Sequence, residues 1–170
     1  EQWTFEGADV FTVTVAGGTV YAQGTDTSVY ALSADDGTIQ WSFRSNRALS
    51  PGPPVVVNGS VYIAFGSEAV YALSADDGTE QWPYETEGRV YSSPAVVDGT
   101  VYVGSEDGNV YAIAADNGTT QWTFQTGDGV YSSPAVVDGT VYVGNNDGNV
   151  RALSADDGTE QWTFQTGGYV

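Results

Sequence analysis

Five glutamine–tryptophan pairs divide the chain at nearly constant intervals, and this internal repeat limits the possible folds more than any other feature. The tryptophans of the 170-residue chain stand 38, 41, 40 and 40 residues apart, at positions 3, 41, 82, 122 and 162. A period of about 40 residues is typical of solenoids and propellers, in which every repeat is one supersecondary unit. The fold must therefore build the same unit about four times.

Each period contains three turn signals separated by runs of strand length. In the third period they are Asp98-Gly99, Asp107-Gly108 and Asn117-Gly118. An Asx-Gly pair between β-branched and aromatic runs is the strongest hairpin signal in a sequence. We therefore expect one up-and-down antiparallel sheet per period. Its strands in this period are expected at residues 90–97, 100–105, 109–115 and 119–126.

The inner strands of this expected sheet are apolar on consecutive residues. Ala95, Val96 and Val97 follow one another, as do the apolar residues 101–103. Such runs indicate that both faces of the sheet are buried, which is the situation of a propeller blade between two neighbouring blades. The tryptophan lies on the outermost strand, from which its ring can pack across to the next blade. The sequence predicts an all-β fold, a β-propeller of four-stranded antiparallel blades. About four blades are present, part or half of a ring of about eight.

The segment that ends at each later tryptophan resembles the repeat of the pyrroloquinoline-quinone-like (PQQ-like) propeller family. The family's blade carries Tyr-Ala-x-Asp-Ala-x-Thr-Gly-Lys-x-x-Trp, and residues 30–41 read Tyr-Ala-Leu-Ser-Ala-Asp-Asp-Gly-Thr-Ile-Gln-Trp. The family's Asp, Thr and Lys are thus replaced by Ser33, Asp36 and Thr38. Related segments return at residues 71–82, 111–122 and 151–162, and the family's Ser-Pro-x-Val start of the inner strand stands at 93–96 and 133–136.

The repeat also predicts the limits of the blades. Residues 1–6 are expected to be the outer strand of a preceding blade, and residues 167–170 the start of a following one. The chain is therefore expected to be a run of blades cut from a longer array, and a homodimer is expected as one way to complete a ring of about eight blades. The four blades between these ends are expected at residues 7–45, 46–87, 88–127 and 128–166.

The charge balance excludes several kinds of partner. The chain has 22 carboxylates against four cations, all of them arginine, and a net charge of −18. Nucleic acid and anionic lipid would be repelled by such a surface. No run approaches the roughly 20 apolar residues of a membrane span, so membrane insertion is not expected. We interpret the excess of acid and the lack of lysine as adaptation to molar salt, where the carboxylates are screened, in a halophilic and archaeal source.

The resemblance implies a catalytic alternative, because the founding PQQ-like proteins are quinoprotein dehydrogenases that hold PQQ and Ca²⁺ on the propeller axis. This chain has no Cys for the vicinal pair often found there and no His as a general base. Residues 90–110 and 130–150 differ only where Ser105-Glu106 becomes Asn145-Asn146, whereas an active site needs different groups in different roles. We therefore expect no catalytic residue and no cofactor.

The expected function is that of a non-catalytic scaffold or protein-interaction module, exported or at the cell surface. Three alternatives stay open: a fragment of a PQQ-dependent quinoprotein dehydrogenase, the sensor or extracellular propeller of a kinase-like protein, and a glycan-binding or structural surface repeat.

Arginines that break the repeat are the candidate binding residues. Arg44 stands where the later blades carry Glu or Gln, Arg47 lies in the loop that follows, and Arg89 replaces a glycine. All three fall in consecutive blade-to-blade connections and are expected on one face, where guanidinium groups would bind the carboxylates of a partner protein. The alternative is that each arginine pairs with a neighbouring acid of its own chain.

Three other features have simpler interpretations. Acidic turns such as Asp76-Asp77-Gly78 are too short to wrap a Ca²⁺ ion and favour turn chemistry, although loosely held cations remain possible. The regular period of the tryptophans and tyrosines indicates core packing. Asn58 and Asn117 match the glycosylation sequon but coincide with hairpin turns, so their modification stays open.

Overall fold

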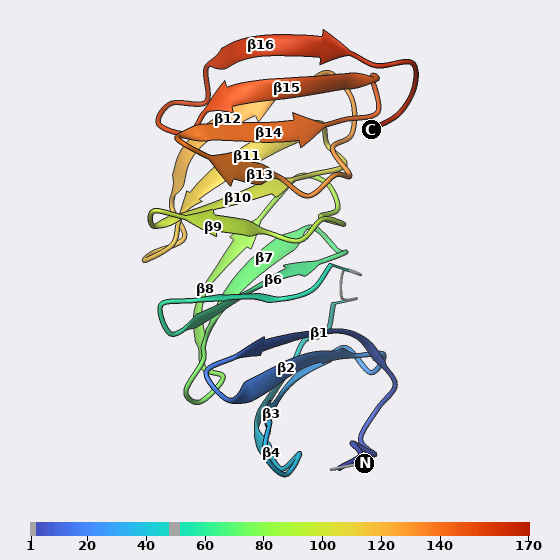
Figure 1. The fold of residues 1–170 in the computed structure, drawn as a ribbon, viewed down its shortest axis with the longest axis vertical. Helices are drawn as coiled ribbons and strands as arrows, with labels where there is room; N and C mark the ends of the chain where they lie inside the picture. The colour runs from blue at the N-terminus through green and yellow to red at the C-terminus, as the bar shows by residue number, and fades with distance from the viewer. Residues whose placement is uncertain (1–2, 48–51) are drawn as a thin grey trace.

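The computed structural model describes residues 3–47 and 52–170, which form four antiparallel sheets of four strands each and no helix (Figure 1). Within every sheet the strands lie side by side in chain order, so each sheet is an up-and-down meander. The expected all-β architecture of four-stranded blades is confirmed. The strands are β1 (Val10–Ala16), β2 (Thr19–Gly24), β3 (Ser28–Ser33), β4 (Ile39–Arg44), β5 (Val55–Val57), β6 (Ser60–Phe65), β7 (Ala69–Ser74), β8 (Glu80–Glu85), β9 (Ala95–Val97), β10 (Thr100–Gly104), β11 (Asn109–Ala114), β12 (Thr120–Gln125), β13 (Ala135–Val137), β14 (Thr140–Gly144), β15 (Asn149–Ser154) and β16 (Glu160–Gln165).

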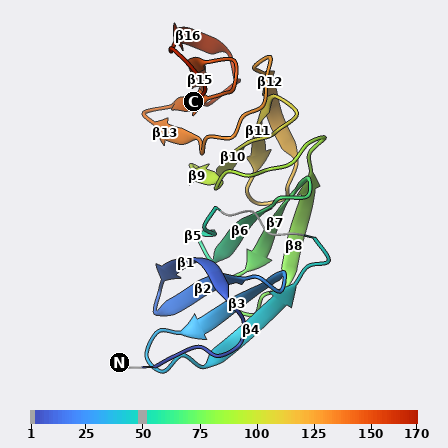
Figure 2. The same ribbon diagram turned by 90° about the vertical axis from the view of Figure 1, so that its right-hand side faces the viewer.

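The four sheets are the blades of a partial β-propeller, and they follow one another along an arc (Figures 1 and 2). The innermost strands are neighbours, with β1 against β5, β5 against β9 and β9 against β13. Strands β8 and β12 lie on the outer side of the arc (Figure 2). The described residues contain no helix long and apolar enough to cross a membrane.

The first hairpin of a blade closes through a two-residue turn that requires left-handed backbone at both positions. In the second blade Asn58 has φ 51° and Gly59 has φ 78°, and Asp98 and Gly99 repeat this in the third blade with 48° and 77°. Two positive φ angles define a type I′ turn, whose twist matches that of the flanking strands. The expected hairpins are therefore present for the expected reason.

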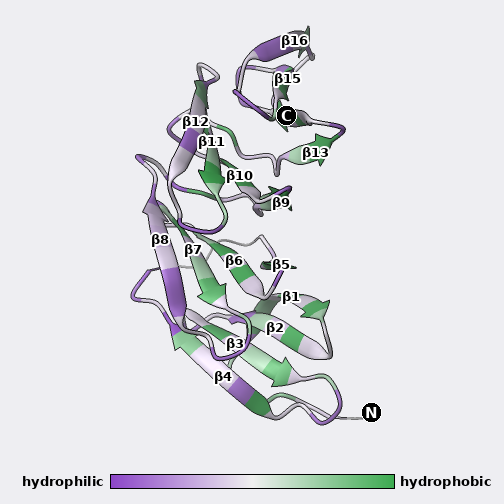
Figure 3. Cartoon of the chain, turned by 90° about the vertical axis from the view of Figure 1, so that its left-hand side faces the viewer, coloured by the Kyte–Doolittle hydropathy of each residue, from purple (hydrophilic) through white to green (hydrophobic). Residues whose placement is uncertain are grey.

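The core lies between blades rather than within one sheet. Strands β6, β7, β10 and β11 show hydrophobic stretches, whereas β8 and β12 carry hydrophilic ones (Figure 3). The ring of Trp82 is buried, and its Nε1 donates to the carbonyl of Ala115 in the next blade at 3.0 Å. Trp41 and Trp122 donate in the same way to Ala75 and Ala155 at 2.8 and 2.9 Å. The role predicted for these tryptophans is confirmed.

The innermost strands are shorter than the sequence pattern predicts. Strand β9 begins at Ala95 rather than at residue 90. In the fourth blade the hydroxyl of Ser132 replaces backbone hydrogen bonds of the sheet. It donates to the carbonyl of Gly144 at 2.8 Å and accepts from the N–H of Gly144 at 2.9 Å. Pro134, which has no N–H to donate, then precedes β13.

Burial on both faces is confirmed for one of the two apolar runs and wrong for the other. Residues 101–103 are fully buried, whereas residues 95–97 are only half-buried. The difference follows from position, because the innermost strand borders the inner side of the arc. A neighbouring blade cannot cover it on every side.

The two ends of the arc also depart from the predicted pattern. Residues 3–6 are not part of a sheet, so the strand expected at residues 1–6 is absent from its described portion. Trp162 is 46% exposed, whereas Trp41, Trp82 and Trp122 are at most 8% exposed. The core position predicted for Trp162 is wrong, because none of the described residues packs as a further blade on that side.

Candidate protein-interaction surface

The blade-to-blade connections and the turns between the second and third strands meet on one face of the arc, which we call the connection face. Its described residues are 24–28, 45–47, 52–54, 66–68, 86–94, 105–108, 126–134, 145–148 and 166–170. Backbone hydrogen bonds hold these segments together: the N–H of Val130 donates to the carbonyl of Ser105 at 2.9 Å, and that of Glu106 to the carbonyl of Arg89 at 2.8 Å. The candidate arginines Arg44, Arg47 and Arg89 all lie at this end of their blades.

Arg44 lies at the end of the outer strand of the first blade. It ends β4 with an exposed side chain and lines a shallow recess of about 410 Å³ together with Thr27, Ser45 and Asn46. Arg44 forms no ion pair with any acid in residues 3–47 or 52–170. Its positive charge lowers the pKa of Tyr30, although the hydrogen bond of that hydroxyl to Asp26 outweighs this and raises the pKa overall. The guanidinium is thus positioned so that an acidic group of another molecule could reach it.

Arg47 is already engaged within the chain. One Nη donates to the carbonyl of Ser67 at 2.8 Å, and the other pairs with Glu85 Oε1 at 2.6 Å. Ser67 and Glu85 both belong to the second blade, so Arg47 ties the first connection to it. Arg47 thus pairs with an acid of its own chain, as the alternative interpretation of the arginines predicts.

Arg89 belongs to an aromatic cluster on the next connection. Its Nη1 donates to the hydroxyl of Tyr91 at 3.0 Å, and the ring of Tyr91 stacks on that of Tyr131 with centroids 5.6 Å apart. Tyr131 in turn donates to Glu106 Oε1 at 3.3 Å. The hydrogen bond to Tyr91 and the charges of Tyr91, Glu106 and Glu68 raise the pKa of Arg89. This exposed guanidinium is therefore partly neutralised by its surroundings.

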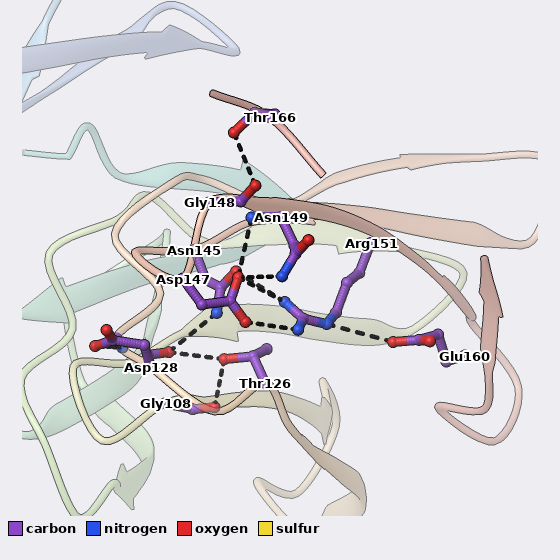
Figure 4. Close-up of polar contacts among 11 residues, drawn as sticks. Gly108, Thr126, Asp128, Asn145, Asp147, Gly148, Asn149, Arg151, Glu160 and Thr166 are labelled. Carbon is purple, nitrogen blue, oxygen red and sulfur yellow. Dashed lines mark hydrogen bonds and ion pairs between the residues drawn. The ribbon is translucent and has the colours of Figure 1, made fainter. Parts of the chain in front are cut away.

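The fourth arginine, Arg151, also pairs within its own blade (Figure 4). It donates to Asp147 Oδ2 at 2.6 Å and Asn145 Oδ1 at 2.8 Å, and its Nε lies 3.3 Å from Glu160 Oε2. Its hydrogen bond is the largest cause that lowers the pKa of Asp147 to about 2. In the third blade the equivalent contact runs from the hydroxyl of Tyr111 to Asp107 at 2.8 Å. Arg151 replaces a neutral donor with a charged one and keeps the architecture of the turn.

In the acidic turns, the carboxylate of the second aspartate accepts hydrogen bonds from its own turn. Asp77 Oδ1 accepts the N–H of Thr79 at 3.1 Å and its hydroxyl at 2.8 Å, and these bonds lower the pKa of Asp77. Asp36 and Asp157 make the same contacts with Thr38 and Thr159. The described residues contain no group of three His, Cys, Asp or Glu side chains that could hold a metal ion.

Clefts between neighbouring blades recur on the face of the arc opposite the connection face. One of about 420 Å³ is lined by Thr100, Tyr102, Gln121 and Asp156, among others. Two of these lining residues are bonded to each other: the hydroxyl of Thr100 donates to Gln121 Oε1 at 3.0 Å. These clefts could not be predicted from the sequence, because each is formed by residues of two different blades.

The sequence prediction and the structure agree on the shared face of Arg44, Arg47 and Arg89 but not on a common cluster. Arg47 and Arg89 are each held by groups of their own connection, and no described contact joins the three. The stacked pair of Tyr91 and Tyr131 was missed, although the recurrence of Val-Tyr-Ser-Ser-Pro at residues 90–94 and 130–134 is a signal for it.

Blades of four antiparallel strands, joined by tryptophans that bond across to the next blade, define a β-propeller segment. The chain belongs to the protein family described as outer membrane protein assembly factor BamB, whose profile matches residues 2–48 and 25–168. The resemblance to PQQ-like repeats is confirmed by this match. No curated protein matches the chain significantly.

Solved propeller structures show the same fold. BamB from Moraxella catarrhalis has a TM-score of 0.79 and 22% identity, over 91% of this chain and 47% of its own. The quinohemoprotein alcohol dehydrogenase ADHIIG from Pseudomonas putida HK5 has a TM-score of 0.78 and 21% identity, over 91% and 33%. The computationally designed protein Ika8 has a TM-score of 0.88 and 14% identity, over 99% and 53%. This chain spans about half or less of the length of each.

Proposed function

We propose that this chain is a non-catalytic propeller module that binds an acidic segment of a protein partner on the connection face. One observation carries the proposal: Arg44 is exposed beside a recess and forms no ion pair with a described acid, on a chain of net charge −18. A cation that pairs with no acid among the described residues, on so acidic a surface, attracts a carboxylate from another molecule.

The setting we propose for this module is a salty, extracytoplasmic one. The excess of carboxylates and the lack of lysine support adaptation to molar salt in a halophilic, archaeal source. Membership of a family described by outer-membrane assembly supports export or a place at the cell surface.

The experiment compares capture of partners by the immobilised wild-type chain and by Arg44→Gln. Glutamine is the residue found at the equivalent positions 125 and 165, so the substitution fits the repeat. We expect a partner that wild type retains through a wash in about 1 M KCl, and whose recovery falls at least about tenfold with Arg44→Gln. Arg47→Gln is the matched control, because Glu85 already occupies that guanidinium, and it should reduce recovery less. Equal recovery by wild type and Arg44→Gln would refute the proposal.

The second candidate is a fragment of a PQQ-dependent dehydrogenase, favoured by the fold shared with the quinohemoprotein alcohol dehydrogenase. Quenching of tryptophan fluorescence by micromolar PQQ with Ca²⁺ would support it. An unchanged spectrum would exclude this candidate for the chain.

A further inference from the structure

Each blade joins the next through a repeated contact between two different faces. On the donating face, the outer-strand tryptophan packs beside a tyrosine of the second strand, as Trp82 does beside Tyr62 at 5.9 Å. The accepting face of the next blade supplies a carbonyl and a glycine. The carbonyl of Ala115 accepts from Trp82 at 3.0 Å and from Tyr62 at 3.3 Å, while the ring lies against Gly118.

The fourth blade has a complete donating face that no described residue covers. Tyr142 and Trp162 lie 5.9 Å apart at 46°, the geometry of the buried pair Tyr102 and Trp122 at 5.8 Å and 46°. Yet Trp162, Phe164 and Val137 are 46%, 63% and 56% exposed. In the third blade, Val97, which corresponds to Val137, packs against the cluster between the third and fourth blades. The uncovered face is therefore preformed for another accepting face (Figure 1, top).

The accepting face of the first blade is only partly covered, at the opposite end of the arc. Phe11, Val13 and Val15 on β1 are exposed, although Val56, the counterpart of Val15, packs into the cluster between the first and second blades. The carbonyl and glycine of this face are taken by Trp3: its Nε1 donates to Ala34 at 3.0 Å, and its ring lies against Gly37.

The segment that contains Trp3 indicates which other segment fits the accepting face of the first blade. Residues 1–5 read Glu-Gln-Trp-Thr-Phe, and residues 160–164 repeat all five in the same order. Phe5 packs on Tyr30 with ring centroids 5.1 Å apart, as Tyr84 packs on Tyr111 at 5.7 Å in the interior of the arc. The amino-terminal segment thus takes the place of an outer strand from another blade. Among the described outer strands, β16 alone has no following blade against it.

We propose that two copies of this chain dock head to tail, with the donating face of the fourth blade on the accepting face of the first blade of the other copy. Trp162 of one copy displaces Trp3 of the other, and two such interfaces close a ring. Head-to-tail interfaces form rings when their rotation closes. Trp3 is then an intrachain competitor that weakens docking. This inference is independent of the proposed function, because it uses the ends of the arc and not the connection face.

The test measures molar mass by light scattering on a sizing column in about 3 M KCl, where charge repulsion between copies is screened. We expect a dimer for wild type, a monomer for Trp162→Ala, and a dimer for Trp3→Ala whose dissociation constant is at least about tenfold lower. Trp162 is exposed in the single chain, so its loss should leave the far-ultraviolet circular dichroism unchanged. Phe164→Ser provides a second disruption of the same face and should also be monomeric.

Several outcomes would overturn the proposal. Monomers for both wild type and Trp3→Ala, or a dimer of Trp162→Ala as tight as wild type, would exclude docking through these faces. A series of masses above the dimer would exclude closure by two copies, and an unchanged dissociation constant for Trp3→Ala would exclude the competing role of Trp3. Arg44→Gln should leave dimerisation unaffected. The test of dimerisation and the test of partner binding at Arg44 can therefore fail independently of each other.

Discussion

The repeated contact between a tryptophan and a glycine predicts an unusually large effect for one methyl group. A Cβ added to Gly78 would lie 2.6 Å from Cε3 and 2.8 Å from Cδ2 of Trp41, closer than side chains pack. The ring cannot easily move away, because Trp41 is buried, bonded to Ala75 at 2.8 Å and packed beside Tyr21. We expect Gly78→Ala to separate the first blade from the second.

The magnitude follows from three contributions. Gly78 has φ +74°, and left-handed backbone costs a residue with a Cβ about 1–2 kcal/mol. Overpacking against the ring costs about 1–3 kcal/mol. A lost hydrogen bond from Trp41 to Ala75 adds about 1 kcal/mol. Together the free energy of unfolding should fall by about 3–6 kcal/mol.

The matched control is Gly59→Ala in the same blade. Gly59 has φ +78°, and a Cβ there would meet nothing within 4 Å. It therefore carries the backbone cost alone, about 1–2 kcal/mol. Urea unfolding followed by far-ultraviolet circular dichroism in about 3 M KCl compares the two variants. Equal losses of stability in Gly78→Ala and Gly59→Ala would refute the role of the ring contact.

Two further predictions concern salt and acid. The net charge of −18 should destabilise the chain below roughly 0.5 M KCl, and a midpoint of thermal unfolding that stays constant from dilute buffer to about 3 M KCl would contradict this. The pKa of Asp147 is about 2 in the fold against about 3.9 in an unfolded chain, so its pair with Arg151 stabilises the fold above about pH 4 and is lost as the pH falls towards 2. The stability of wild type should therefore exceed that of Arg151→Ala by about 1–2 kcal/mol at neutral pH, with a gap that narrows on acidification. A gap independent of pH would count against the pair.

Features set by a few adjacent residues could be predicted from the sequence. The type I′ turn at Asn58-Gly59 and the turn at Asp77-Gly78 depend on local backbone preferences, so their residues identify them directly. The apolar runs and the period then require a sheet covered on both faces, and hence a blade. The start of the innermost strand was misjudged, because the hydroxyl of Ser132 replaces ladder hydrogen bonds and Pro134 has no N–H to donate, neither of which hydrophobicity shows.

The candidate site was only partly predictable. Its arginines stand out as breaks in the repeat, and their common face follows from the order of strands in a blade. Which guanidinium stays available depends on partners far along the chain: Arg47 is neutralised by Glu85, 38 residues away, while Arg44 has no such neighbour among the described residues. Such pairs form only when the fold brings a connection against the blade that follows it.

By itself, the sequence determined the unit of this protein: four strands, three turns and one tryptophan, repeated, because each follows from local preferences and a strict period. The tertiary structure decided what each copy of the unit does. Trp122 and Trp162 share the motif Gln-Trp-Thr-Phe-Gln, yet one is 8% and the other 46% exposed. Whether such a tryptophan is buried depends on the blade packed against it. Only the tertiary structure shows which blades have such a neighbour.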